Sequence, residues 1–250
     1  MNREQEYRKF VNRKNLQSFT VRVKETDITV QADRNLSDVA RESILTFRGH
    51  IETFIIHHPD FATSLVPWNP DTPAPLIIHE MIRSGNMAGV GPMAAVAGAV
   101  AEFVGKDLLA YSREVVVENG GDIFMKLNSP ATVGIYAGKS PLSMKLGIRL
   151  IPDDRPLSVC TSSGTIGHSL SYGKADAVCI VSHSCALADA AATAIGNRIQ
   201  SGSDIKHAVQ AAKNMDGILG AVAIIDDIIG LWGDLDIIPL TEKNSRGKKG

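Results

Sequence analysis

The sequence has little cysteine, and its positive and negative charges almost cancel. Only Cys160, Cys179 and Cys185 occur in 250 residues, and they form neither a CxxC pair nor a zinc-ligand pattern. An odd number of unpatterned cysteines indicates reduced thiols and a cytoplasmic protein. The formal net charge of −1 argues against nucleic acid or an acidic membrane surface as the main partner.

Strongly apolar runs of membrane-spanning length are also absent. Residues 1–15, MNREQEYRKFVNRKN, have no apolar core, which excludes a secretory signal peptide. One uncharged run, residues 84–101, has 18 residues, but it contains four glycines and its apolar content is mostly alanine. A membrane span needs about 20 strongly apolar residues. We therefore expect no membrane partner.

The composition is that of an ordinary globular protein, with 44% hydrophobic and 21% charged residues. The length suffices to bury a substantial core. No linker or internal repeat interrupts the chain, so we expect one domain over residues 1–240. The last ten residues, TEKNSRGKKG, are basic and lack apolar side chains, and we expect them to form a flexible tail.

The order of periodic segments predicts an α+β fold with a mixed, largely antiparallel sheet packed against helices. Residues 19–24 and 27–31 alternate in polarity and predict a hairpin, and apolar residues at steps of three and four predict a helix over 36–58. The other expected helices are 74–83, 92–104, 184–200 and 203–214, with Ser203 as N-cap of the last. The other expected strands are 113–118, 122–127, 132–137, 144–151, 157–161 and 175–182, followed by a strand meander over 217–240.

A glycine-rich loop lies at a predicted helix start. Gly89 and Gly91 precede Pro92, which suits the first turn of a helix. Exposed N–H groups and the helix dipole at such a position can bind a phosphate or carboxylate. The spacing is neither GxGxxG nor GxxxxGK[ST], so a close-packed Ala/Gly helix entered through a flexible loop is an equal alternative.

Two further loops are candidates for ligand binding. Gly120-Gly121 stands between two apolar runs and is either a plain hairpin turn or bare backbone for a ligand to approach. The stretch SVCTSSGTIGHSLSYG, 158–173, gathers hydroxyls and glycines that can surround phosphates or sugar hydroxyls. Its Gly-His-Ser-Leu-Ser lacks the final glycine of a nucleophile elbow, which disfavours a serine hydrolase.

A helix made almost entirely of alanine carries a carboxylate and a hydroxyl. Asp189 and Thr193 stand at i and i+4, which places them on one helix face. A carboxylate on such a surface has to be paired or bind a metal, and carboxylate and hydroxyl oxygens suit magnesium. The alternative is an exposed aspartate near a helix N-terminus.

Taken in this order, the motifs resemble those of the ApbE family, flavin transferases once called thiamine-biosynthesis lipoproteins. NGGDI at 119–123 resembles the family's Gly-Gly-Asp motif, and CTSSG at 160–164 resembles its Ser-Gly loop. LADAAATAIG at 187–196 is similar to its Ala-Asp-Ala-x-Ala-Thr-Ala helix, the most specific of the three. The resemblance covers roughly residues 85–230 and points to a cytoplasmic branch without the lipoprotein signal.

The resemblance implies a magnesium-dependent site for a nucleotide-like or phosphorylated small-molecule ligand, with FAD as a candidate. It assigns magnesium to Asp189 and Thr193. The family's His-x-x-Asp-Pro-x-Thr-Gly segment is shortened here, and His168 is the candidate for its histidine, with a catalytic role. The expected cofactor-binding residues are Gly89, Gly91, Gly120, Gly121, Asp122, Ser163, Gly164 and Thr165.

Two other functions stay open at the level of the sequence. The first is a sulfur-handling enzyme that uses Cys160 as its catalytic thiol, because backbone N–H groups of the neighbouring Thr-Ser-Ser-Gly loop can stabilise a thiolate. The alternative for Cys160 is a small buried strand residue. The second function is a non-catalytic scaffold that keeps the fold with a degenerate site.

Overall fold

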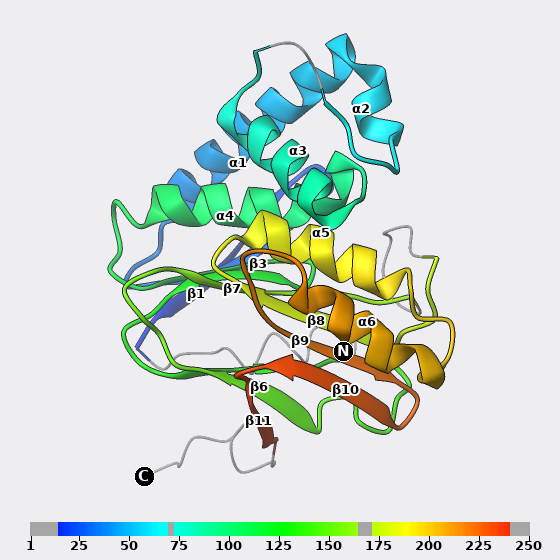
Figure 1. The fold of residues 1–250 in the computed structure, drawn as a ribbon. Helices are drawn as coiled ribbons and strands as arrows, with labels where there is room; N and C mark the ends of the chain where they lie inside the picture. The colour runs from blue at the N-terminus through cyan, green and yellow to red at the C-terminus, as the bar shows by residue number, and fades with distance from the viewer. Residues whose placement is uncertain (1–14, 70–72, 165–171, 241–250) are drawn as a thin grey trace.

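An eight-stranded antiparallel sheet forms the centre of the structure, a computed structural model that describes residues 15–69, 73–164 and 172–240 (Figure 1). The strand order is β1-β2-β3-β4-β7-β8-β9-β10, and each neighbouring pair is antiparallel. This confirms the expected α+β class with a largely antiparallel sheet. The strands are β1 (Gln17–Val23), β2 (Thr26–Ala32), β3 (Val115–Asn119), β4 (Asp122–Lys126), β7 (Leu157–Ser162), β8 (Ala177–Ser182), β9 (Ile218–Ile225) and β10 (Ile228–Gly233).

The helices cover one face of this sheet. In Figure 1, α4, α5 and α6 lie next to the strands, whereas α2 and α3 lie further from them. The longest helix, α1, packs against both β1 and α4. The helical elements are α1 (Ser37–His57), α2 (Pro59–Thr63), α3 (Leu76–Ala88), the 3₁₀ turn η3 (Pro92–Ala95), α4 (Val96–Leu108), α5 (Cys185–Gly196), the 3₁₀ turn η4 (Gly202–Asp204) and α6 (Ile205–Lys213).

A second, three-stranded sheet covers the opposite face. It has the order β11-β6-β5 and consists of β5 (Ala131–Gly134), β6 (Leu146–Leu150) and β11 (Asp236–Pro239). The large sheet therefore separates two hydrophobic cores, one under the helices and one under the small sheet. The strand pattern of the sequence did not predict that these three strands leave the main sheet.

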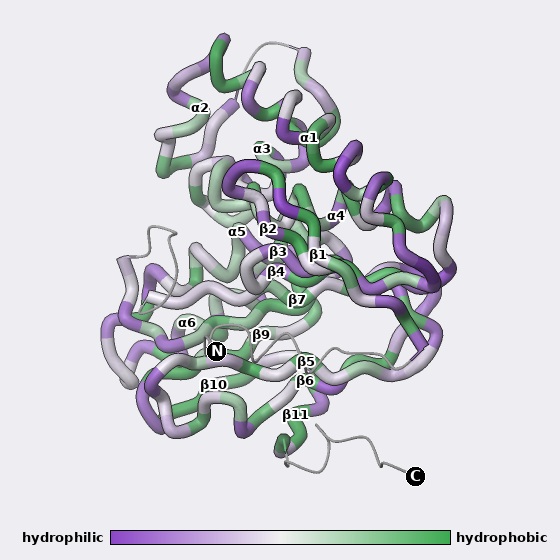
Figure 2. The backbone as a smooth tube through the Cα atoms, turned by 180° about the vertical axis from the view of Figure 1, so that it is seen from behind, coloured by the Kyte–Doolittle hydropathy of each residue, from purple (hydrophilic) through white to green (hydrophobic). Residues whose placement is uncertain are grey.

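Burial on both faces explains the apolar composition of the central strands. All six residues of β8, Ala-Val-Cys-Ile-Val-Ser, are buried, because helices cover one side and the small sheet covers the other. Strands covered on both faces have near-continuous apolar sequences instead of alternating ones. Figure 2 shows hydrophobic stretches along these central strands.

Several helix boundaries differ from the sequence-based expectation. The helix expected over 74–83 is α3, which continues to Ala88. The segment expected as a helix over 92–104 begins as a 3₁₀ turn and continues as α4 to Leu108. The helix expected over 184–200 ends at Gly196. Ser203, expected as N-cap of the helix over 203–214, lies inside η4, and the N-cap position of α6 is Asp204. Ser201 caps η4 instead, where the Asp204 carboxylate accepts the Ser201 N–H at 2.9 Å and completes a capping box.

The uncharged run 84–101 joins the end of α3 to the start of α4. These two helical segments meet at a bend of 106°. In the described ranges, no helix by itself has the length and apolar character needed to cross a membrane.

Candidate functional site

Gly120 and Gly121 form the two-residue turn between β3, which ends at Asn119, and β4, which begins at Asp122. Gly120 and Gly121 have φ values of 66° and 108°, so the turn requires glycine for conformational reasons. Asp122 lies opposite Cys160 on β7, and a Cβ built on Gly121 would be 3.6 Å from the Thr161 carbonyl oxygen. The turn therefore lies beside the end of β7, where Ser163 and Gly164 follow.

Two side-chain hydrogen bonds hold this turn in place. Within the hairpin, Gly121 N donates to Glu118 Oε1 at 3.0 Å. Towards α4, Asn119 Nδ2 donates to the Ala97 carbonyl oxygen at 3.0 Å. The second bond joins the edge of the glycine turn to the first turn of α4.

Helices α4 and α5 touch at Gly98. A Cβ on this residue would be 2.4 Å from the Cys185 carbonyl oxygen and 2.8 Å from Asp189 Cβ. Only glycine permits so close an approach. The contact brings Gly98 N within 2.8 Å of Asp189 Oδ2, to which it donates a hydrogen bond.

Glu102 on α4 in turn accepts hydrogen bonds from the first turn of α5. Its side chain is buried, and Oε2 accepts the N–H groups of Cys185 at 2.7 Å and Ala186 at 3.3 Å. Its other oxygen pairs with Lys106 Nζ at 2.6 Å. Sequence reasoning missed Glu102. The available signal was that it is the one charged residue between positions 84 and 105.

The ionised Asp189 carboxylate acts on Asp122 and disfavours its ionisation. Burial raises the pKa of Asp122 well above its usual value, and the neighbouring Asp189 charge raises it further. Burial also raises the pKa of Asp189 to about 7, against the opposing effect of the Gly98 and Ala97 N–H groups. Within the described parts of the chain, neither carboxylate forms an ion pair with lysine or arginine.

These oxygens fit a hard divalent cation in part. Thr193 lies one helical turn after Asp189, and both side chains are half-buried. The residues that the structure describes contain no cluster of three His, Cys, Asp or Glu side chains able to hold a metal. Magnesium usually keeps several waters and takes one or two carboxylates together with substrate phosphates, so a magnesium site does not require a cluster of three such side chains. The metal-binding role of Asp189 and Thr193 stays a prediction.

Close glycine contacts fix the Ser-Gly loop against the end of α5. A Cβ on Gly164 would be 2.0 Å from the Gly173 carbonyl oxygen, and one on Gly173 would be 1.9 Å from that of Gly196. Tyr172 N also donates to Asn197 Oδ1 at 2.9 Å. Gly164 and Tyr172, the described residues on either side of 165–171, therefore lie near the C-terminus of α5. Thr165, His168 and the Gly-His-Ser motif lie outside the described residues.

Gly89 and Gly91 have local structural reasons to be glycine. Gly89 ends α3 in the left-handed conformation, with φ of 76°. Gly91 is buried, and a Cβ there would be 1.7 Å from the Ser64 carbonyl oxygen. Packing therefore accounts for Gly91 without a ligand, and its predicted part in cofactor binding stays a prediction.

The environment of Cys160 is wrong for a nucleophile. Its thiol is fully buried, donates to the Cys185 carbonyl oxygen at 3.3 Å and lies 3.5 Å from Cys185 Sγ. Burial raises the pKa of the Cys160 thiol well above its usual value, whereas a reactive thiolate needs a lowered one. The catalytic role expected for Cys160 is therefore corrected in favour of a buried strand residue.

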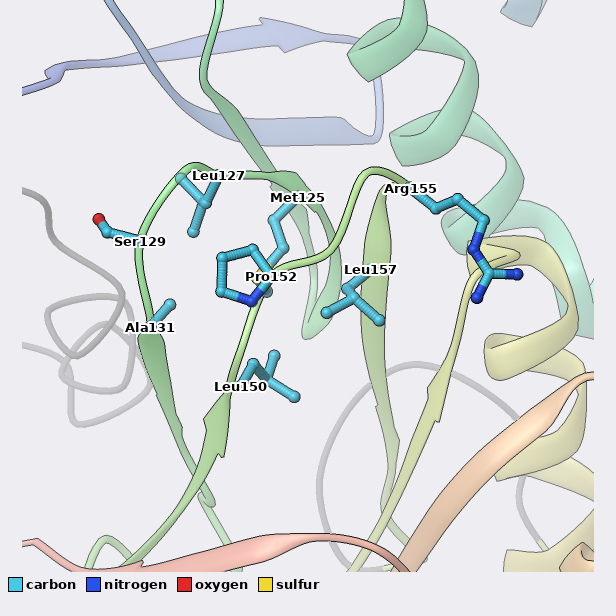
Figure 3. A pocket seen from close by; sticks show the side chains of 8 residues that line it. All are labelled: Met125, Leu127, Ser129, Ala131, Leu150, Pro152, Arg155 and Leu157. Carbon is cyan, nitrogen blue, oxygen red and sulfur yellow. The ribbon is translucent and has the colours of Figure 1, made fainter.

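A separate apolar pocket lies on the other side of the large sheet, away from these groups. Its volume is about 10 Å³, which is room for roughly one water molecule. Figure 3 shows the side chains that surround it: Met125, Leu127, Ser129, Ala131, Leu150, Pro152, Arg155 and Leu157. It is too small for a nucleotide-like ligand.

The sequence of the chain is similar to those of known proteins. The family model described as "AbpE bacteria" matches residues 8–234. A UPF0280 protein of Methanosarcina acetivorans is 39% identical over 223 residues, 88% of each chain. Another, from Methanocella arvoryzae, is 41% identical over 214 residues, 85% of this chain and 87% of that one.

Solved structures share the fold at low sequence identity. The apo flavinyl transferase ApbE of Pseudomonas stutzeri aligns with a TM-score of 0.57 and 14% identity, over 86% of this chain and 94% of that chain. The ApbE protein of Thermotoga maritima aligns with a TM-score of 0.52 and 13% identity, over 86% and 96%. The matches to the family model and to the UPF0280 proteins show that the chain belongs to the ApbE-like family.

Proposed function

We propose that the protein binds a flavin nucleotide, or a similar phosphorylated ligand, together with Mg²⁺. The observation that carries this proposal is the pair of carboxylates, Asp122 and Asp189, brought to the same turn of α4 by the Asn119–Ala97 and Gly98–Asp189 hydrogen bonds. Neither has a basic partner in the described parts of the chain. Two such groups are costly to ionise next to each other unless a cation neutralises them. A bound divalent cation removes that cost.

Each part of the site has a distinct role in this proposal. Asp189 and Thr193 hold Mg²⁺, and Asp122 supplies a second negative charge beside them. An added Cβ at Gly120 would meet no atom within 4 Å, so a ligand can approach the main chain of the turn. Ser163 offers a hydroxyl from the loop that follows β7. When bound, Mg²⁺ would neutralise phosphate oxygens of the ligand.

Membership of the ApbE-like family makes flavin the first ligand to test. The solved relatives with this fold include a flavinyl transferase, and transfer of a flavin group is the candidate reaction. His168 is the candidate catalytic residue. The three buried thiols fit a reducing cytoplasm. The other function that stays open is a scaffold of the same fold that binds no nucleotide.

Ligand binding is best measured with metal-free protein. FAD, FMN and ADP are added with and without Mg²⁺, and the melting temperature and flavin fluorescence are recorded. A ligand that binds the folded state raises the melting temperature by mass action. We expect stabilisation by FAD only when Mg²⁺ is present, and loss of that effect in Asp189→Asn and Thr193→Val. No response to any of these ligands would favour the scaffold.

A further inference from the structure

We infer that Glu102 is a positioning residue that fixes the first turn of α5 and thereby sets where Asp189 presents its carboxylate. This inference rests on the proposed function, in which Asp189 binds the cation. It adds a residue that lies on a different helix and is absent from the three family motifs. Glu102 is expected to control cation affinity without contacting the cation.

Glu102 and Asp189 close a ring of contacts between α4 and α5. The Glu102 carboxylate accepts the Cys185 N–H at 2.7 Å, and the Asp189 carboxylate accepts the Gly98 N–H at 2.8 Å. Gly98 and Glu102 are separated by one turn of α4, and Cys185 and Asp189 by one turn of α5. The two helices are therefore joined at both ends of a single helical turn.

The sequence repeats across the two helices. Residues 98–102 are Gly-Ala-Val-Ala-Glu, and residues 185–189 are Cys-Ala-Leu-Ala-Asp. Each segment places a small residue, whose N–H is donated to the other helix, four positions before the carboxylate that accepts from the other helix. The two hydrogen bonds that these segments form, Gly98 N–H to Asp189 and Cys185 N–H to Glu102, link the position of Asp189 to that of Glu102.

Helix α5 has an N-cap from its own sequence. The hydroxyl oxygen of Ser184 accepts the Leu187 N–H at 3.2 Å. The same hydroxyl donates to Glu80 Oε1 at 3.0 Å and, at the longer distance of 3.4 Å, to Glu102 Oε2, so Glu80 still holds it when Glu102 is changed. Removing the Glu102 contact therefore leaves a formed helix whose first turn is free to shift against α4. A shift of the first turn moves Asp189, one turn further along, by a similar amount.

Two substitutions of Glu102 separate the position of its carboxylate from its charge. Glu102→Asp keeps the negative charge but withdraws the carboxylate by one methylene. Glu102→Gln keeps the length and an oxygen that can accept the Cys185 N–H, but removes the charge. If Glu102 acts by positioning, Glu102→Asp is the harmful change, and Glu102→Gln retains most of the function.

The test measures binding of Mn²⁺, added alone, by electron paramagnetic resonance of the free ion. We expect Glu102→Asp to weaken Mn²⁺ binding by about tenfold, the effect typical of groups that orient a metal ligand, and Glu102→Gln to stay within about twofold of wild type. Val104→Ala, a buried change elsewhere on α4, is the stability control. It is expected to lower the melting temperature and leave Mn²⁺ affinity unchanged.

Two results would overturn the inference. Wild-type affinity in Glu102→Asp would mean that Asp189 does not depend on Glu102. A larger loss in Glu102→Gln than in Glu102→Asp would mean that Glu102 acts through its charge. Asp189→Asn separates the inference from the proposed function. If Asp189→Asn binds Mn²⁺ like wild type, the proposed site itself fails; if it loses Mn²⁺ and Glu102→Asp does not, only the role of Glu102 fails.

Discussion

Glu102 on α4 and Asp189 on α5 occupy equivalent positions in two helices that cap each other. Each carboxylate accepts main-chain N–H groups from the first turn of the other helix. A negative charge at a helix N-terminus is favourable because the first N–H groups have no partner within the helix. The arrangement fixes the crossing of α4 and α5 and places Asp189 beside the glycine turn of β3 and β4.

The first prediction concerns the crossing point. Gly98→Ala would place a methyl group 2.4 Å from the Cys185 carbonyl oxygen, so α4 and α5 would have to separate. We expect the free energy of unfolding to fall by about 1–3 kcal/mol, as for other overpacked cores. Urea denaturation measures it.

The matched control for this prediction is Gly49→Ala. Gly49 lies on the exposed side of α1, and an added Cβ would meet nothing within 4 Å. Alanine is favoured over glycine in a helix interior, so this variant should be more stable by up to about 1 kcal/mol. A Gly98→Ala protein as stable as wild type would show that the two helices are not in close contact.

The second prediction is that metal-free protein loses stability as the pH rises towards 8. The pKa of Asp189 is about 7 in the folded protein, against 3.8 for an ordinary aspartate. Between these two pH values the folded state therefore binds more protons than the unfolded state. The contribution of protonated Asp189 to the free energy of unfolding is fully present below about pH 4 and is lost as the pH rises through 7. Urea denaturation in EDTA at pH 5 and pH 8 should differ by on the order of 2 kcal/mol.

Asp189→Asn tests the origin of this pH dependence. The variant cannot ionise at position 189, and it also removes the charge that raises the pKa of Asp122. Its stability should therefore change much less between pH 5 and pH 8. An unchanged slope in Asp189→Asn would assign the effect to other groups.

The third prediction is that the thiols of the native protein are inert. Cys160, Cys179 and Cys185 are buried, and burial raises the pKa of each, that of Cys179 to about 11. Iodoacetamide at pH 8 should modify none of them in native protein and all three in guanidinium chloride, as counted by mass spectrometry. Rapid alkylation of Cys160 alone in the native protein would restore the sulfur-handling hypothesis.

The fourth prediction separates packing glycines from ligand-facing ones. Gly91→Ala would place a methyl group 1.7 Å from the Ser64 carbonyl oxygen, so we expect a loss of about 2 kcal/mol or more in stability without any ligand. Gly120→Ala meets no atom but has to adopt a positive φ, which costs about 1–2 kcal/mol.

Ligand binding distinguishes the two variants further. Gly120→Ala adds a methyl group at the surface that the proposed ligand approaches, so it should weaken FAD binding in the presence of Mg²⁺. The affinity of folded Gly91→Ala should stay close to that of wild type. Comparable loss of FAD affinity in Gly91→Ala would support the predicted cofactor-binding role of the 89–91 loop.

Local sequence patterns determined most elements of the fold. Alternation over 19–24 and 27–31 corresponds to β1 and β2, and the helical period from residue 36 corresponds to α1. These patterns are readable because one side of each element faces a core and the other faces solvent. The Asn-Gly-Gly-Asp sequence likewise indicated its own turn, since both glycines adopt positive φ.

The tertiary structure alone decided which groups share the site. No local pattern brings Asp122 of β4 near Asp189 of α5, since 66 residues separate them in the chain and the packing of α5 against β7 and β4 brings them together. Nothing in the local sequence around Glu102 indicates a partner for its carboxylate, and only the packing of α4 against α5 places it against the first turn of α5. The hydrogen-bond partners of a buried carboxylate depend on which surfaces pack against each other in the folded protein. Contacts between segments that are far apart in the chain produce no periodic pattern in the sequence.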